Sequence, residues 1–205
     1  MNNRIGYRQV VARLSEQRIA HETIPLQNGV TVVASQWGGR AFGPFLPGEE
    51  ESVGWLPAAF ADSHSFAKLI SSGEWNLGGE RLWIGPEIQY LMRERRSIPG
   101  ATEEVIQSAM DPGAWELTID SSCAWRFHQQ MTLQAHNLAT GCKALDVERV
   151  FRLAENPLRA LNGSDRLMER VVYAGYEQVV TLRDLTPDEI SSAPWWVCQL
   201  NPGGT

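Results

Sequence analysis

The chain has 205 residues, which is enough for one domain with a hydrophobic core or for two small ones. Its 43% hydrophobic and 20% charged residues are ordinary for a globular protein. Its net charge of −6 argues against a nucleic-acid ligand, because a phosphate backbone requires clustered cations. No apolar run of about 18 residues and no signal-peptide pattern is present, so we expect a cytoplasmic protein that does not span a membrane.

The N-terminal segment, residues 1–20, is expected to contain a helix that packs outside the rest of the molecule. Residues 5–18 carry this prediction, because Val10 and Leu14 recur at helical spacing between charged positions. The remainder, residues 25–205, is predicted to be a sheet region without a linker or an internal repeat. We therefore expect one domain.

The next segments show turn and helix signals. Residues 22–35 read as two short strands, and Asn28 and Gly29 between them suit a hairpin turn because both tolerate positive φ. Residues 36–51 contain many glycines and prolines and are predicted to form a loop. Residues 62–72 are predicted to form a short helix with an aspartate or serine as its N-cap.

After residue 110 the pattern is that of β-strands. Residues 115–120 alternate between apolar and polar side chains, and residues 128–136 do the same with Met131, Leu133 and Ala135 on the apolar face. Further strands are predicted at residues 144–153, 157–162, 169–182 and 195–200. Many short strands with few helices indicate a mainly β, antiparallel sandwich with one or two short helices.

Residues 78–87, GGERLWIGPE, hold the most distinctive pattern in the chain. Glycines at one end and a proline at the other bound a short segment, and Arg81 and Trp83 share one face if that segment is extended. With Glu87 beyond the bend, these residues suit a sugar, whose hydroxyl groups need planar donors and carboxylate acceptors and whose C–H face stacks on an aromatic ring. The alternative is that Trp83 belongs to the core and that Arg81 pairs with a neighbouring glutamate at the surface.

Three stretches together resemble the leading half of the galactose mutarotase-like (aldose 1-epimerase-like) superfamily. They are GVTVVASQWGGRAFGPF at residues 29–45, GGERLWIGPE at 78–87 and PWWVCQLNPGG at 194–204, and the resemblance spans residues 25–204. It implies a large antiparallel β-supersandwich whose concave face binds carbohydrate. It also implies that Arg81 contacts sugar hydroxyl groups.

The sequence departs from that superfamily in the residues expected to catalyse a reaction. A mutarotase uses a histidine as general acid and a glutamate as general base on one sugar. The family's histidine motifs are not visible, and its catalytic glutamate belongs to the trailing half of the fold. His128 and His136 are the candidate general acids here, although eight residues of strand, about 26 Å at 3.3 Å per residue, would keep them from sharing one substrate.

The polar residues between the two histidines are candidate ligand groups. Gln130 and Gln134 fall on the same face of the predicted strand and could line a surface that binds hydroxyl groups. The alternative is an ordinary solvated sheet face. Arg40, which follows two glycines at a predicted turn, could point into the same cleft as Arg81.

We expect neither a metal nor a cofactor. The three cysteines are widely spaced without a C-x-x-C pair, which indicates reduced thiols rather than a zinc site. Asp62 and His64 lack a third ligand at suitable spacing. Gly38 and Gly39 are not followed by the G-K-[ST] of a phosphate-binding loop.

Two functions of different classes follow from these patterns. The first is a carbohydrate-binding domain, either non-catalytic or an aldose 1-epimerase-type isomerase, with a small sugar or polyol as its ligand. The second is a non-catalytic structural or interaction domain. The predicted strand at 195–200 is followed by turn residues and no further strand, so an exposed sheet edge is expected, which favours association with another chain, including a homo-oligomer.

Overall fold

The computed structural model describes residues 5–48, 51–95, 102–120, 124–163, 165–186 and 189–202, and the fold is mainly β. The first sheet has the strand order β1-β2-β3-β4-β11: β1 (His21–Pro25), β2 (Thr31–Ser35), β3 (Arg40–Phe45), β4 (Glu80–Gly85) and β11 (Ala193–Cys198). The second has the order β10-β9-β8-β7: β10 (Tyr176–Asp184), β9 (Gly141–Leu153), β8 (Trp125–Ala135) and β7 (Glu116–Ile119). All pairings within these two sheets are antiparallel.

The remaining elements are short. A small antiparallel sheet pairs β5 (Met92–Arg95) with β6 (Thr102–Glu104). The α-helices are α1 (Tyr7–Glu16), α2 (Ser63–Ser71), α3 (Glu87–Tyr90) and α4 (Asp165–Met168), and the 3-10 helices are η1 (Gln27–Gly29), η2 (Trp37–Gly39), η3 (Ala58–Ala61) and η4 (Pro157–Ala160). No helix within the described ranges is both long enough and apolar enough to cross a bilayer.

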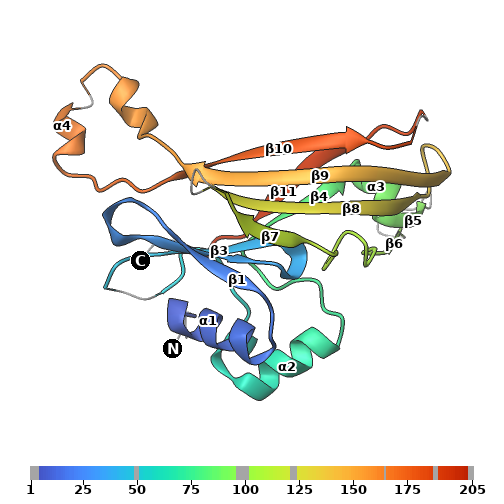
Figure 1. Ribbon diagram of the computed structural model, residues 1–205, viewed down its shortest axis with the longest axis horizontal. Helices are drawn as coiled ribbons and strands as arrows, with labels where there is room; N and C mark the ends of the chain where they lie inside the picture. Colours follow the sequence, from blue (N-terminus) through green and yellow to red (C-terminus); the bar gives the residue numbers. More distant parts are fainter. Residues whose placement is uncertain are drawn as a thin grey trace.

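The elements are arranged in layers (Figure 1). The four-stranded sheet forms one layer, β1 to β3 lie below it, and α1 and α2 lie on the far side of these strands. One apolar cluster fills the space between the sheets and includes Phe127 of β8 and Val147 of β9. A second cluster, which includes Val10 and Leu14 of α1 and Phe66 of α2, lies beneath the helices. The segment that carries η4 and α4 projects from one end of β9 and β10.

Most predicted elements are confirmed. The helix at the N-terminus packs against the outside of the first sheet, and α2 is capped by Asp62, whose Oδ1 accepts a hydrogen bond from the Ser65 amide at 2.7 Å. The hairpin pairs His21 with Ser35 through Pro25 with Thr31, and both turn residues have positive φ, 57° at Asn28 and 76° at Gly29. The favourable φ values explain why this dipeptide predicted the turn.

Two predicted elements are wrong. Residues 40–45, predicted as loop, form β3; the β2 and β3 pairing shifts register at Gly43 and Pro44, so the proline lies in an irregularity rather than in the regular hydrogen-bond ladder. Residues 157–162, predicted as a strand, instead begin with η4, because the Asn156 side chain accepts a hydrogen bond from the Leu158 amide and starts a tight turn. The predicted strand at 169–182 begins only at Tyr176.

Candidate functional site

Arg81 and Trp83 lie on the same face of β4, as their spacing predicts, but both side chains are in the interior. The Arg81 guanidinium packs against two indoles that also contact each other, 4.4 Å from the ring centre of Trp83 and 4.7 Å from that of Trp75. Arg81 is only 3% exposed and Trp83 only 5%. The expectation that the two side chains face an open pocket therefore does not match their position, because Trp75 covers the guanidinium.

Arg40 joins this cluster from the start of β3. Its Nη2 donates to Asp111 Oδ2 at 2.6 Å, its Nη1 donates to the Gly78 carbonyl at 3.1 Å, and the same Asp111 oxygen accepts from Trp83 Nε1 at 3.0 Å. Arg40 and Arg81 therefore belong to one buried cluster, whereas the sequence suggested a cleft that both could enter. We call Arg40, Trp75, Arg81, Trp83 and Asp111 the Arg81 cluster.

The Arg81 cluster contains two cations and one carboxylate. Arg40 forms the ion pair with Asp111, whereas the Arg81 guanidinium contacts the two indoles and donates to Gln199 Oε1 at 3.2 Å. Burial, reinforced by the charge of Arg40, lowers the pKa of Arg81 to about 10, and Asp111 opposes the shift. Burial also lowers the pKa of Arg40. The geometry is that of a structural cluster in which one carboxylate and the aromatic faces stabilise two buried cations.

A second buried cluster connects the two sheets. Glu80 of β4 accepts hydrogen bonds from Arg149 Nη2 at 3.0 Å, from Gln178 Nε2 at 2.6 Å and from Tyr176 Oη at 2.5 Å. Arg149 also donates to Gln178 Oε1 at 2.5 Å and to the Gly39 carbonyl. We call Glu80, Arg149, Tyr176 and Gln178 the Glu80 cluster. The sequence did not reveal it, because its members are distributed over β4, β9 and β10.

Tyr176 offers a direct test of the Glu80 cluster. Burial raises the pKa of its phenol far above the ordinary value of about 10, and the negative charge of Glu80 adds to the shift. The phenol of the unfolded chain ionises near pH 10 and that of the folded chain does not, so the contribution of Tyr176 to stability is present below about pH 10 and is lost as the pH rises.

Near-ultraviolet absorbance is titrated with pH for the wild type and for Tyr176→Phe, and the difference between the two curves isolates the Tyr176 phenol. We expect this difference to show no phenolate absorbance until the protein unfolds. A phenolate that appears near pH 10 in the folded protein would contradict this account of the cluster.

The two candidate histidines are not brought together. His128 lies on the outer face of β8, where its Nε2 is 2.7 Å from Asp146 Oδ1. His136 follows the end of β8; its amide donates to the Gln89 carbonyl, and its buried Nε2 has no hydrogen-bond partner among the described residues. Gln130 and Gln134 are exposed on the same strand face as His128. This row is a solvent-facing sheet surface, the second of the two readings left open by the sequence.

Glu87 begins α3 and is exposed, away from the buried face that holds Arg81. The end of β4 explains the separation, because alternation along a continued strand would place Glu87 on the face of Arg81 and Trp83, but β4 ends at Gly85 and Glu87 belongs to α3. Across the described ranges, no group of three or more histidine, cysteine, aspartate or glutamate residues has a geometry that could hold a metal ion.

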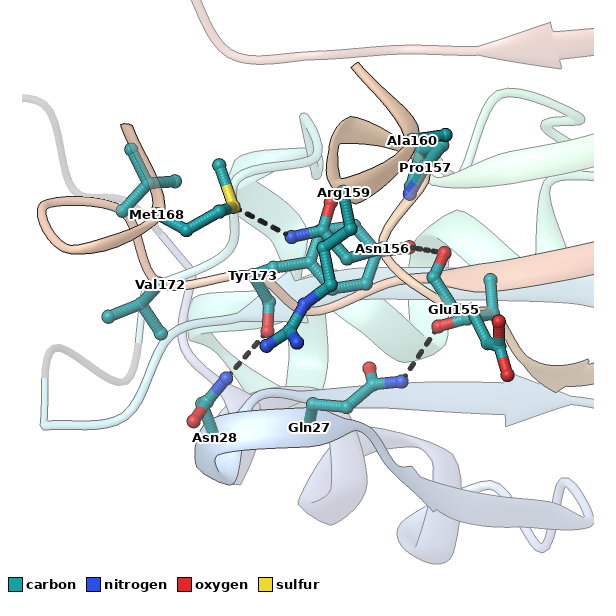
Figure 2. A pocket seen from close by; sticks show the side chains of 12 residues that line it. Gln27, Asn28, Glu155, Asn156, Pro157, Arg159, Ala160, Met168, Val172 and Tyr173 are labelled. Atoms are coloured by element: carbon teal, nitrogen blue, oxygen red, sulfur yellow. Dashed lines mark hydrogen bonds between the residues drawn. The ribbon is translucent and has the colours of Figure 1, made fainter. Parts of the chain in front are cut away.

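A solvent-open cleft lies elsewhere, between the β1–β2 turn and the segment of residues 154–173 (Figure 2). Its volume is about 920 Å³. The polar side chains that line it are Gln27, Asn28, Glu155, Asn156, Arg159 and Tyr173, and the apolar ones include Met168, Val171 and Val172. Figure 2 shows Arg159 extending from the η4 segment toward Asn28, across the cleft.

Hydrogen bonds fix the two walls of the cleft relative to each other. Gln27 donates from Nε2 to the Ala154 carbonyl at 2.8 Å and accepts at Oε1 from the Gly175 amide at 3.0 Å. Asn28 Nδ2 donates to the Tyr173 carbonyl at 2.6 Å, and Tyr173 Oη donates to the Glu155 carbonyl at 3.1 Å. Contacts within the chain itself therefore fix the spacing of the two walls.

Sequence reasoning missed this cleft. The only local signals were turn residues, Asn28-Gly29 on one wall and Asn156-Pro157 on the other, and nothing local indicated that the two turns meet.

Comparison of the chain with known protein families, with curated proteins and with solved structures finds no match.

Proposed function

We propose that this chain is a carbohydrate-binding domain of the galactose mutarotase-like type, and that it binds a small sugar or another neutral polyol in the cleft between the β1–β2 turn and residues 154–173. The observation that carries the proposal is the cleft itself, which has a volume of about 920 Å³, within the usual range for sites that bind small ligands. The Arg81 cluster is not proposed as the site because its arginines are buried.

The chemistry of the cleft suits a polyhydroxylated ligand. The Arg159 guanidinium, the Glu155 carboxylate and the Asn28 Oδ1 offer planar donors and acceptors for hydroxyl groups, while Gln27 and Asn156 are hydrogen-bonded within the chain. Tyr173, Met168 and the adjoining valines offer apolar surface for the C–H face of a sugar ring. Among the described residues, Arg159 and Glu155 are the charged ones that line the cleft, and their charges balance. A neutral ligand is therefore favoured over a phosphate or another anion.

The walls also favour binding through preorganisation. Gln27 and Asn28 are held by hydrogen bonds across the cleft, and the Tyr173 hydroxyl by a hydrogen bond to the Glu155 carbonyl in its own wall, before any ligand arrives. A ligand that enters would not have to order these side chains, which reduces the entropic cost of binding. The proposal concerns binding alone, because His128 and His136 lie outside the cleft.

Arg159→Ala is expected to weaken sugar binding by about tenfold or more, because a hydrogen bond from a charged donor contributes about 1.5–3 kcal/mol. The measurement is isothermal titration calorimetry with a panel of neutral mono- and disaccharides. Arg159 is exposed, so its truncation should leave the thermal unfolding temperature nearly unchanged.

The matched control is Arg152→Ala, an exposed arginine of β9 that does not line the cleft and whose loss should leave the affinity unchanged. Equal weakening by both substitutions would contradict the assignment of the site. Absence of binding to every sugar of the panel would contradict the function.

The segment that forms one wall also supports the second function, an interaction domain. Leu158, Leu161 and Val172 are large apolar side chains that are at least 42% exposed on this projecting segment. Exposed apolar groups that gather in one region are typical of protein contacts. Binding of a protein with no response to any sugar would favour this second function.

A further inference from the structure

β10 forms an open edge of the four-stranded sheet. It pairs with β9 over its whole length, from Tyr176 opposite Leu153 to Asp184 opposite Leu145, and no segment within the described ranges pairs with its other side. Every second residue of an edge strand turns its backbone N–H and C=O groups away from the sheet. Figure 1 shows β10 at the border of this layer.

The centre of this edge lacks the features that commonly prevent pairing, because the charged residues of β10, Glu177, Arg183 and Asp184, lie toward the two ends of the strand. β10 is nine residues long, contains neither proline nor lysine, and keeps an uninterrupted register with β9, without a bulge. Val179 and Thr181, at its centre, are exposed residues of types that favour strands. The strand is therefore suited to accept another strand.

We propose that β10 pairs with β10 of a second copy of this chain, antiparallel and centred on Val180, which joins the two four-stranded sheets into one of eight strands. A twofold axis at Val180 lets all nine residues of both strands pair, because each residue then lies opposite the residue equally far from the centre. This pairing places Glu177 of each copy opposite Arg183 of the other.

The charges select this register. Opposite charges on facing residues of an antiparallel pair stabilise it, and the twofold axis creates the contact between Glu177 and Arg183 twice. A shift by two residues in either direction removes both contacts, since Glu177 then faces Thr181 or Leu185. Within one chain, Glu177 pairs with Arg152 and Arg183 pairs with Asp146. The side chains of Glu177 and Arg183 are 53% and 71% exposed, so each can keep this ion pair and also contact the opposite charge of the second copy.

The test uses two charge reversals and their mixture. Glu177→Arg and Arg183→Glu each place like charges opposite one another in a homodimer, and each should raise the dissociation constant by about tenfold or more. An equimolar mixture of the two variants restores both opposite-charge contacts, because one variant carries arginine at both facing positions and the other carries glutamate at both. Sedimentation velocity measures the wild type, each variant and the mixture over a range of concentrations.

Glu116→Arg is the matched control, since it makes the same charge change at an exposed position of β7, the opposite edge of the sheet, and should leave dimerisation unchanged. Thermal unfolding confirms that each variant is folded. A wild type that remains monomeric at all concentrations would overturn the proposal. So would folded variants that dimerise as the wild type does, or a mixture that associates no better than its components.

Discussion

Arg149→Met is expected to lower the free energy of unfolding by about 3–5 kcal/mol, which is a large part of the 5–15 kcal/mol typical of a domain. Arg149 is fully buried and Glu80 is only 9% exposed, so the substitution leaves a buried carboxylate without its cation. It also removes the hydrogen bond from Arg149 to the Gly39 carbonyl, which connects β9 to the end of η2, directly before β3. Urea unfolding followed by tryptophan fluorescence measures the loss.

Two further variants separate the buried charge from the loss of packing. Arg152→Met, three residues further along β9, breaks an exposed ion pair with Glu177 and should cost about 1 kcal/mol or less. The double variant Glu80→Gln with Arg149→Met removes both charges and should be more stable than Arg149→Met alone. A loss for Arg149→Met no greater than that for Arg152→Met would show that the Glu80 cluster does not hold the sheets together.

Asp111→Asn is expected to cost about 3 kcal/mol or more, because Arg40 and Arg81 then share the interior without a carboxylate. The substitution preserves the shape of the side chain and leaves an oxygen for Trp83 Nε1, so the effect reports the charge. Burial already lowers the pKa of both arginines, and removal of the opposing Asp111 charge should lower them further. The measurement is again the free energy of unfolding from urea titration.

Asp120→Asn is the control for that substitution. The Asp120 side chain pairs with Arg126 at 3.2 Å, and both are about one-third exposed, so its loss should cost about 1 kcal/mol or less. If Asp111→Asn proves as mild as Asp120→Asn, the Arg81 cluster is not stabilised by its carboxylate, and the cations must be compensated in another way.

The regular parts of the fold could be predicted because their signals are local. The alternation of Met131, Leu133 and Ala135 with exposed polar residues in β8 follows from a sheet that is buried on one face only. The turn at Asn28 follows from backbone sterics within two residues. In contrast, β3 was missed because a glycine and a proline that occupy a register irregularity resemble a loop when pairing is unknown.

The sites could not be predicted from local signals because they depend on contacts between distant residues. Arg40 pairs with Asp111, 71 residues away, and Arg149 pairs with Glu80, 69 residues away. Periodicity identified Arg81 and Trp83 as neighbours on one face, but their burial depends on Trp75, which belongs to another segment. The same limit applies to the cleft, whose walls meet over separations of 127 to 148 residues.

The most direct test of the proposed function is a protein-observed NMR titration of the isotope-labelled chain with the sugar panel. We predict saturable shifts of amide signals that gather at Asn28, at residues 155–159 and at Tyr173, around the cleft. Saturable shifts that gather instead at Arg81 and Trp83, or no shift with any sugar, would contradict the proposal that this cleft binds carbohydrate.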